Sequence, residues 1–216
     1  MGRIILQDVC KTIKSKVILD HINLELEQGS VYGFWGRNGS GKTMLFRAIC
    51  GLIKIDSGKI SVFGNEIGRD VSFPPSLGVI IENVGFWDQY TGLENLRLLA
   101  SIRKKIGSDE ICSALERVGL DPADKRTYKK YSLGMKQRLG IAQAIMEQPE
   151  LIVLDEPTNA LDEEGVFQIR KVIQEEEQRG ATVLIASHNK EDLNTLCERQ
   201  FQLQNGRIVP DPQSAD

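Results

Sequence analysis

The stretch Gly36-Arg37-Asn38-Gly39-Ser40-Gly41-Lys42-Thr43 decides the fold, because it fits the pattern G-x-x-x-x-G-K-[ST]. The apolar segment before it, residues 31–35, is predicted to be a strand buried on both faces. A helix is predicted over residues 42–50, and Gly51 is a suitable residue to end it. This order of strand, glycine-rich loop and helix is the setting in which the pattern binds phosphate, although a glycine-rich turn can match it by chance.

The residue types of the loop suit phosphate chemistry. Glycines let backbone N–H groups wrap a phosphate without Cβ clashes, and the helix N-terminus adds a positive partial charge. We expect Lys42 to reach the β- and γ-phosphates and Thr43 to offer its hydroxyl to Mg²⁺. The predicted nucleotide contacts run along the whole loop and one residue beyond it: Gly36, Arg37, Asn38, Gly39, Ser40, Gly41, Lys42, Thr43 and Met44.

Two carboxylates follow a second apolar run, Leu151-Ile152-Val153-Leu154. Ligands of open α/β sheets bind at the carboxyl ends of strands, so Asp155 is predicted to hold Mg²⁺, directly or through water. Glu156 is predicted to orient and deprotonate an attacking water. The alternative is that two adjacent acids merely end a strand. His188 follows another predicted strand and either donates to the γ-phosphate or is an ordinary exposed loop residue.

Composition narrows the class of protein. The chain has 216 residues and a formal net charge of −3, with 27 basic and 30 acidic residues. That balance disfavours a nucleic-acid partner, since such proteins usually carry a basic excess. No apolar run approaches the roughly 18 residues that cross a bilayer. If the protein works at a membrane, we expect another chain to supply the membrane part.

The order of patterns predicts an α/β fold. Buried strands that alternate with helices indicate a mostly parallel sheet covered on both faces. Alternating strands at 3–9 and 17–26 form a predicted N-terminal antiparallel part, and Asn205-Gly206 predicts a late hairpin. Helices are predicted at 94–105, after a capping Ser108, and at 132–147. We therefore predict one domain, 1–216, with a core of about 1–87 and 148–216 and an inserted helical subdomain of about 88–147.

Four further segments carry a resemblance to a known family. Residues Tyr131-Ser132-Leu133-Gly134-Met135-Lys136-Gln137-Arg138 resemble the signature segment, usually LSGGQ, of the ATP-binding cassette (ABC) ATPases. Asp155-Glu156-Pro157-Thr158 resembles the strand-end acid motif of that family, Ala160-Leu161-Asp162 its D-loop, and Ser187-His188 its switch histidine. With the phosphate loop, these motifs stand in the order of the family and span essentially the whole chain.

The resemblance implies a function and partners. It implies an ATPase that uses ATP and Mg²⁺, with Glu156 and His188 as catalytic residues. It further implies a head-to-tail dimer with a second nucleotide-binding subunit, identical or different, and two ATP molecules between the subunits. Ser132, Gly134, Met135 and Asp162 would then act on the nucleotide of the partner. A transmembrane permease chain would hold the protein in the cytoplasm, on the inner face of the membrane.

The resemblance is strongest to the cassettes of bacterial peptide-antibiotic and lantibiotic exporters or immunity transporters. It rests on Ser132-Leu133-Gly134-Met135 and on Leu77-Gly78-Val79-Ile80-Ile81-Glu82-Asn83. The alternative function is that of a soluble ABC ATPase, for example in iron–sulfur assembly.

The chain departs from the family pattern at three places. Glu82 stands where the family has a glutamine that touches Mg²⁺, and we expect Glu82 to be a metal-side residue, with Gln89 as the alternative. Ile13 stands where an aromatic residue usually stacks on adenine. Met135 replaces the usual glutamine of the signature.

Two other segments have more than one interpretation. Phe86, Trp87 and Tyr90 either form a groove for the membrane partner or pack within the helical subdomain. Residues 189–192 match the guanine-reading pattern NKxD, which would imply GTP. GTPases also carry an Asp-x-x-Gly switch, whereas Asp155 here is followed by Glu156-Pro157-Thr158. The alternative is that residues 189–192 are the polar start of a helix.

Overall fold

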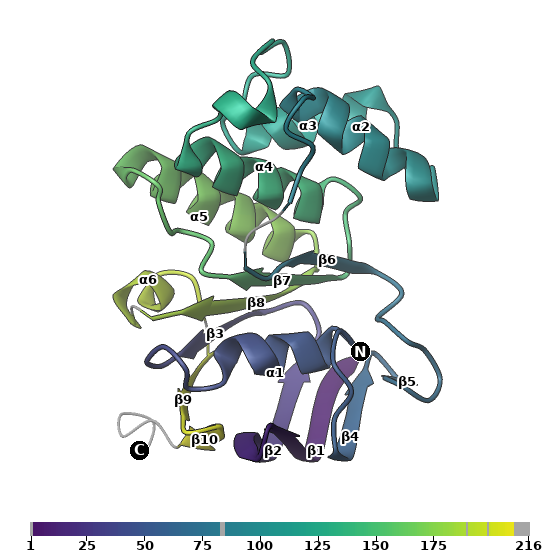
Figure 1. The fold of residues 1–216 in the computed structure, drawn as a ribbon, viewed down its shortest axis with the longest axis vertical. Coiled ribbons are helices and arrows are strands. Elements are labelled where there is room, and N and C mark those ends of the chain that lie inside the picture. The colour runs from purple at the N-terminus through teal and green to yellow at the C-terminus, as the bar shows by residue number, and fades with distance from the viewer. Residues whose placement is uncertain (1, 83–84, 189, 198, 210–216) are drawn as a thin grey trace.

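The computed structural model describes residues 2–82, 85–188, 190–197 and 199–209 (Figure 1). A six-stranded sheet runs through its middle in the order β10-β9-β3-β8-β7-β6. Strands β9, β3, β8, β7 and β6 are parallel to their neighbours, and only β10 at the edge is antiparallel. The bounds are β3 Val31–Trp35, β6 Leu77–Ile80, β7 Leu151–Asp155, β8 Thr182–Ser187, β9 Arg199–Gln204 and β10 Arg207–Val209. The predicted mostly parallel sheet and the hairpin at Asn205-Gly206 are confirmed.

The central strands are apolar throughout because both faces of the sheet are covered. In β7, Leu151 and Val153 pack into one apolar cluster, while Ile152 and Leu154 pack into the other. This alternation is the period of two that a strand imposes on its side chains. Helices α4 (Leu133–Ile145) and α5 (Glu163–Gln178) cover one face, and α1 (Lys42–Ile49) covers the other (Figure 1).

The N-terminal part forms a second, antiparallel sheet below α1 (Figure 1). Its order is β2-β1-β4-β5, with bounds β1 Arg3–Ile13, β2 Lys16–Glu27, β4 Ser57–Val62 and β5 Asn65–Glu66. Apolar residues of β1, β2 and β4 share one cluster with α1 and the lower face of the main sheet. Helix α1, which carries Lys42 and Thr43, is therefore held between two sheets.

Helices α2 (Gly92–Arg103), α3 (Ser108–Arg117) and α4 form the opposite end of the molecule, with a short 3₁₀ turn at Tyr128–Lys130 (Figure 1). Helix α2 begins two residues earlier than predicted because Thr91 and Glu94 form a capping box at its start. The prediction that Ser108 caps α3 is wrong. Gly107 holds the cap position, and its N–H donates to Glu110 Oε2 at 2.9 Å, so Ser108 is the first helical residue.

The β9–β10 hairpin lies against the phosphate loop. The Gly206 N–H donates to the Ser40 carbonyl at 2.9 Å, and its own carbonyl accepts the Asp20 N–H at 2.9 Å. Gly206 has a φ of +78°, and a side chain there would press on the backbone of Ile18. The hairpin thus ties β2 to the phosphate loop. No helix within the described ranges is long and apolar enough to cross a membrane.

Candidate nucleotide-binding site

The phosphate loop leaves the end of β3 and enters α1, and within it the Ser40 N–H donates to the Arg37 carbonyl at 3.0 Å. Gly41 is the N-cap of α1 and has a φ of +111°, and no side chain caps the helix. The first-turn N–H groups therefore remain available for an anion. Gly36 could not carry a side chain, because a Cβ there would collide with the carbonyl of Leu203. The Lys42 ammonium donates to the Gly36 carbonyl at 2.7 Å, across the span of the loop.

Thr43 and Asp155 meet at the start of α1 and the end of β7. Thr43 Oγ1 donates to Asp155 Oδ2 at 2.6 Å, and Asp155 is buried. Burial raises the pKa of Asp155, an effect that the Thr43 hydrogen bond and the Lys42 charge oppose. A hydroxyl oxygen and a buried carboxylate are the hard ligands that Mg²⁺ prefers, and a cation would relieve the desolvation that raises this pKa. The residues present therefore fit a magnesium ion.

Glu156 and His188 lie together at the ends of neighbouring strands. Asp155 pairs with Ala186 in register, and the Glu156 N–H donates to the Ala186 carbonyl at 2.9 Å. Glu156 has a φ of +51°, an uncommon value for a residue with a side chain. His188 Nδ1 is 2.8 Å from Glu156 Oε2. The structure thus brings the expected base and the expected switch histidine into direct contact.

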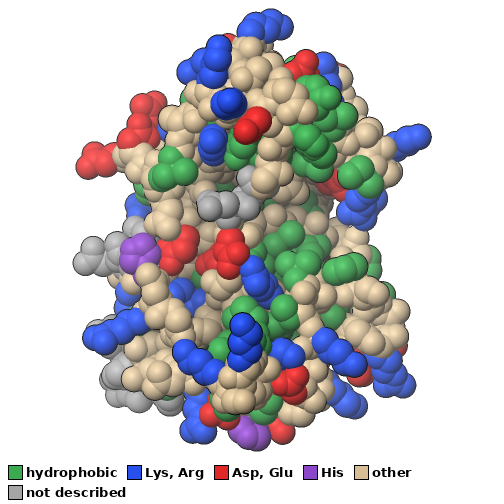
Figure 2. Space-filling model, viewed as in Figure 1, with side chains coloured by type: hydrophobic (Ala, Val, Ile, Leu, Met, Phe, Trp, Pro, Cys, Tyr) green, Lys and Arg blue, Asp and Glu red, His purple; other side chains and the backbone are tan. Residues whose placement is uncertain are grey.

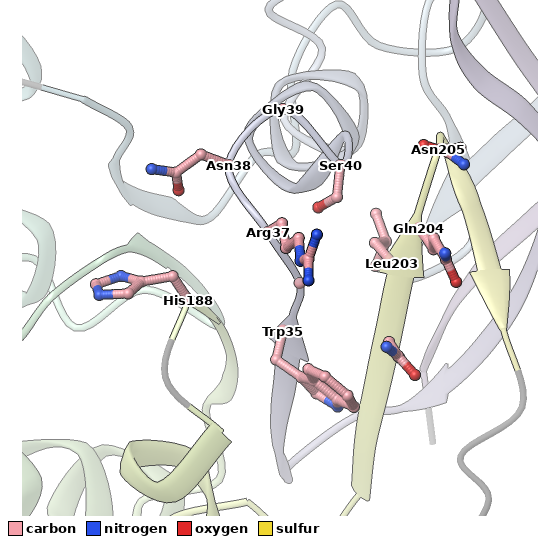
Figure 3. A pocket seen from close by; sticks show the side chains of 11 residues that line it. Trp35, Arg37, Asn38, Gly39, Ser40, His188, Leu203, Gln204 and Asn205 are labelled. Carbon is pink, nitrogen blue, oxygen red and sulfur yellow. The ribbon is translucent and has the colours of Figure 1, made fainter.

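Two cavities flank the phosphate loop. The first, of about 370 Å³, is lined by the loop from Asn38 to Met44, by Asp155 and Glu156, and by Lys16 and Ile18 of β2. The second, of about 640 Å³, lies on the other side of the loop. Figure 3 shows Arg37 and Trp35 at its centre, His188 on one side and Leu203, Gln204 and Asn205 of β9 and its turn on the other. The smaller cavity is the nucleotide candidate, because it contains Lys42, Thr43 and both acids.

The surface around these residues is hollowed. Figure 2 shows acidic side chains beside a histidine at mid-height, with basic side chains above and below them. An acidic centre within a basic surround suits a ligand in which metal and phosphate carry opposite charges.

Residues 131–138 contact residues 156–162, and we call these two segments together one assembly. Ser132 caps α4, where its Oγ accepts the Met135 N–H at 3.2 Å. Gln137 donates its amide to the carbonyls of Glu156 at 3.1 Å and Pro157 at 3.3 Å. Asp162 caps α5 and pairs with Arg138 at 3.1 Å. Among the described residues that line the 370 Å³ cavity, however, none comes from this assembly except Glu156.

Comparisons with known proteins decide the family. The family model described as "ABC transporter" matches residues 19–159. The chain belongs to the ABC transporter ATP-binding family. It is an ATP-binding subunit of the ABC transporter type, and its enzymatic activity is ATP hydrolysis.

Relatives of this cassette are similar over most of its length. An uncharacterized ABC transporter ATP-binding protein, YybJ of Bacillus subtilis, is 45% identical over 93% of this chain and 92% of that protein. The bacitracin transport ATP-binding protein BcrA of Bacillus licheniformis is 40% identical over 94% and 67%. The lantibiotic transport ATP-binding protein SrtF of Streptococcus pyogenes is 33% identical over 94% and 88%. These relatives favour a transporter cassette over a soluble ABC ATPase.

A solved structure shares the fold of this cassette. It is described as a dimeric post-hydrolysis state of the ATP-binding cassette MJ0796 bound to ADP and Pi, with a TM-score of 0.87. It is 22% identical and covers 96% of this chain and 97% of that one. The expected fold class, a phosphate-loop NTPase core with an antiparallel β subdomain and an inserted helical subdomain, is confirmed.

The structure places two of the departures of this cassette from the family pattern, Glu82 and Ile13. Glu82 does not line the 370 Å³ cavity in the described part of the chain but pairs with Arg47 of α1 at 2.8 Å. Gln89, the alternative, is exposed. Ile13 is 39% exposed, and Lys16 and Ile18 line the cavity instead.

The segment that matches NKxD is only partly described. Asn189 lies outside the described residues, as do the side chains of Glu191 and Asp192. The segment does enter helix α6 (Lys190–Asn194), as its interpretation as a helix start predicts.

Sequence reasoning missed several residues of the site. Lys16 and Ile18 approach the loop only because β2 packs beside the hairpin that holds Ser40. Arg47 pairs with Glu82, and Gln137 donates to the carbonyl of Glu156, 19 positions along the chain. No local pattern marks these residues, since each contact is created by packing between elements.

Proposed function

We propose that this cassette powers the export of a small molecule or peptide through a separate membrane-spanning chain. The observation that carries the proposal is the similarity to BcrA and SrtF, which are named bacitracin and lantibiotic transport ATP-binding proteins. The substrate specificity would then lie in the permease. The cassette would sit in the cytoplasm against the inner face of the membrane.

Within the site, each residue has a proposed role. Thr43 and Asp155 hold Mg²⁺, and Lys42 with the loop N–H groups holds the ATP phosphates. Bound Mg²⁺ supplies charge neutralisation at the phosphate oxygens. A Glu156 carboxylate oxygen accepts a proton from the attacking water. His188, whose Nδ1 contacts Glu156, fixes that carboxylate and leaves Nε2 free to face a phosphate.

The nucleotide contacts of Ser132, Gly134, Met135 and Asp162 are proposed to cross a dimer interface. Ser132 is exposed at the start of α4, and Leu133 beside it is 66% exposed. An exposed leucine next to a helix N-terminus suits a surface that a second cassette covers around a phosphate. The partner cassette is either identical or a related chain.

The permease is proposed to contact the exposed part of the segment before α2. Phe86 is buried and packs against the Tyr128 ring at 5.3 Å between centroids, which supports packing for this residue. Trp87 and Tyr90 are 46% and 36% exposed. These two rings are the proposed contact.

Co-purification from membranes tests the export proposal. The tagged cassette is extracted in mild detergent, and the associated chains are identified by mass spectrometry. We expect a polytopic membrane protein, recovered less well with a variant that carries Trp87→Ala and Tyr90→Ala. Recovery of soluble partners alone, or of ribosomes, would contradict the transport role and leave the ATPase activity standing.

A further inference from the structure

Three side chains on β1 and β2 bring different metal-binding groups together at one point of the N-terminal sheet. They are the carboxylate of Asp8, the thiol of Cys10 and the imidazole of His21, and one ligand atom of each lies within 4.8 Å of the others. Asp8 and His21 are exposed, whereas Val9 and Ile22 beside them are buried in the apolar core. The cluster therefore lies on the face of the sheet that points away from the core.

The backbone of β1 and β2 is irregular at these residues, and the irregularity directs the side chains toward one another. The register between the strands shifts twice, with one extra residue in β1 at residues 7–8 and one in β2 at residues 20–21. Asp8 and His21 lie in these two bulges with φ values of +50° and +52°, which residues with a side chain seldom adopt. A bulge re-aims the side chain that it carries. Here His21 Nδ1 lies 2.5 Å from Asp8 Oδ1.

The sulfur of Cys10 faces the same point, because its Sγ accepts the His21 N–H at 3.3 Å. Zinc bonds of about 2.3 Å to sulfur and about 2.0 Å to nitrogen place these two donor atoms about 3.5 Å apart in a tetrahedral site. The side chains of Asp8 and His21 are 64% and 65% exposed, so they are free to rotate into that geometry. A cation between them would replace the proton of their hydrogen bond.

A further carboxylate, that of Asp20, lies on the other side of the imidazole. Asp20 Oδ1 is 3.8 Å from His21 Nε2, and Asp20 Oδ2 accepts from Arg207 Nε at 2.7 Å. The Asp20 N–H donates to the Gly206 carbonyl, so the β9–β10 hairpin holds this residue through both its backbone and its side chain. Metal-binding histidines almost always donate their second ring N–H to a carboxylate, a carbonyl or water. Asp20 is the group placed to accept it here.

The cluster opens onto a cavity of about 480 Å³. His21 lines this cavity together with Asp20, Asn23, Arg207 and Ile208. Its described lining shares no residue with that of the 370 Å³ nucleotide cavity. The cavity leaves room for a water molecule beside the three protein ligands, which is the arrangement of an open four-coordinate zinc site.

We propose that Asp8, Cys10 and His21 bind a zinc-type divalent cation, with Asp20 as a positioning residue for the imidazole. The ligand atoms are a carboxylate oxygen, the sulfur and Nδ1, and water completes the site. The thiol releases its proton to solvent as the metal–sulfur bond forms. Thiolate and imidazole select against Mg²⁺, so this site and the proposed magnesium site take different ions. The bound cation ties β1 to β2 at the two bulges.

Titration of the reduced, nucleotide-free protein with Co²⁺ in excess Mg²⁺ tests the proposal. A cobalt–thiolate bond gives a charge-transfer absorption band, which the oxygen ligands of a magnesium site cannot give. We expect this band to saturate at about one Co²⁺ per chain and to disappear when Zn²⁺ is added, because zinc prefers a tetrahedral site with sulfur and nitrogen ligands. A parent protein that shows no such band would overturn the proposal.

Variants of the ligands show which thiol and which imidazole bind. Cys10→Ser should abolish the charge-transfer band, and His21→Ala should weaken Co²⁺ binding at least about tenfold, since even the loss of an outer carboxylate costs that much. Cys112→Ser, which removes a partly exposed thiol from α3, is the matched control and should keep the band. A band that persists in Cys10→Ser would contradict the site, and circular dichroism melting confirms that each variant is folded.

The role of Asp20 has a separate readout. Asp20→Asn should weaken Co²⁺ binding about tenfold while the charge-transfer band remains, because Cys10 still binds the metal. Asp109→Asn, at an exposed position in α3, should bind as the parent does. Equal affinities for Asp20→Asn and the parent would remove Asp20 from the proposal.

Discussion

The phosphate-loop region and the signature region of this cassette differ in how complete they are within one chain. In the first, Lys42, Thr43, Asp155, Glu156 and His188 converge from α1, β7 and β8 through direct contacts. In the second, Ser132 and Gly134 begin α4 at an exposed helix start. The same helix contacts the segment after Glu156, where Gln137 donates to the Pro157 carbonyl and Arg138 pairs with Asp162. The first region lines a cavity with the proposed base Glu156, and among the described residues of that cavity none comes from the helix start of the second region.

The difference fits the proposal that each chain carries two halves of a site, which a second chain completes. Gln137 links the halves, because it lies in α4 and donates to the carbonyl of Glu156. Gly134 also packs on the D-loop, where a Cβ would lie 2.9 Å from the Ala160 carbonyl. A displacement of α4 would therefore shift the backbone at Glu156, the proposed base.

The largest expected effect comes from Glu156→Gln. The amide keeps the shape but cannot accept a proton, so turnover should fall roughly 10²–10⁴-fold while ATP still binds. Phosphate release and equilibrium binding of a fluorescent ATP analogue measure the two quantities. Glu164→Gln, an exposed acid in the first turn of α5, is the control and should stay within twofold. Unchanged turnover in Glu156→Gln would remove this residue from the role of base.

Lys42→Ala should weaken ATP binding at least tenfold, since a buried ammonium directed across the loop is lost. The measurement is titration with the fluorescent analogue. Lys54→Ala, at an exposed position beyond α1, should bind as the parent does. Equal affinities for the parent and Lys42→Ala would place the phosphates elsewhere.

Ser132→Asp separates the two regions, because aspartate can still cap α4 at this exposed position. An acid at this helix start opposes a phosphate from a partner, so turnover should fall about 10- to 100-fold. ATP affinity of the isolated chain should change less than twofold, because the 370 Å³ cavity contains no signature residue among those described. Ser108→Asp places an acid at the start of α3 and is the matched control. A loss of ATP affinity in Ser132→Asp but not in the control would contradict the separation.

The smallest expected effect is on stability. Burial raises the pKa of Asp155, so the folded protein binds this proton more readily than the unfolded chain does. The charged form therefore destabilises the metal-free fold above that pKa, and the penalty disappears as pH falls through it. In EDTA at pH 7, Asp155→Asn should raise Tm by about 2–4 °C, the shift for roughly 1 kcal/mol.

The difference between Asp155→Asn and its parent should shrink at acidic pH, as measured by scanning calorimetry. Asp88→Asn, at an exposed position, serves as the control. A lower Tm for Asp155→Asn at pH 7 would mean that its contact with Thr43 outweighs the burial penalty.

Sequence predicted the parts of the fold that depend on neighbouring residues. The phosphate loop, the acids after β7 and the hairpin at Asn205-Gly206 are local patterns, and the family resemblance was confirmed. The predicted cap at Ser108 is wrong, because Gly107 holds the cap position and donates its N–H to the Glu110 carboxylate. The subdomain boundaries at 88 and 147 and the roles of the site residues stay predictions.

Other parts of the site could not be predicted from local patterns, because contacts between distant elements decide them. The sequence predicted Glu82 on the metal side. It could not predict the ion pair of Glu82 with Arg47, because only the fold brings the end of β6 close to α1. For the same reason, the sequence did not predict that Lys16 and Ile18, rather than Ile13, line the 370 Å³ cavity.

The central proposal is that two chains complete each ATP site, and light scattering after size exclusion tests it most directly. Glu156→Gln should run as a single 24.1 kDa chain without nucleotide and as a dimer with ATP. The double variant Glu156→Gln, Ser132→Asp should bind ATP and remain a single chain. If Glu156→Gln binds ATP yet stays a single chain up to high protein concentration, the signature region does not meet the nucleotide of a second cassette of this kind, and the proposal of a homodimeric site is contradicted.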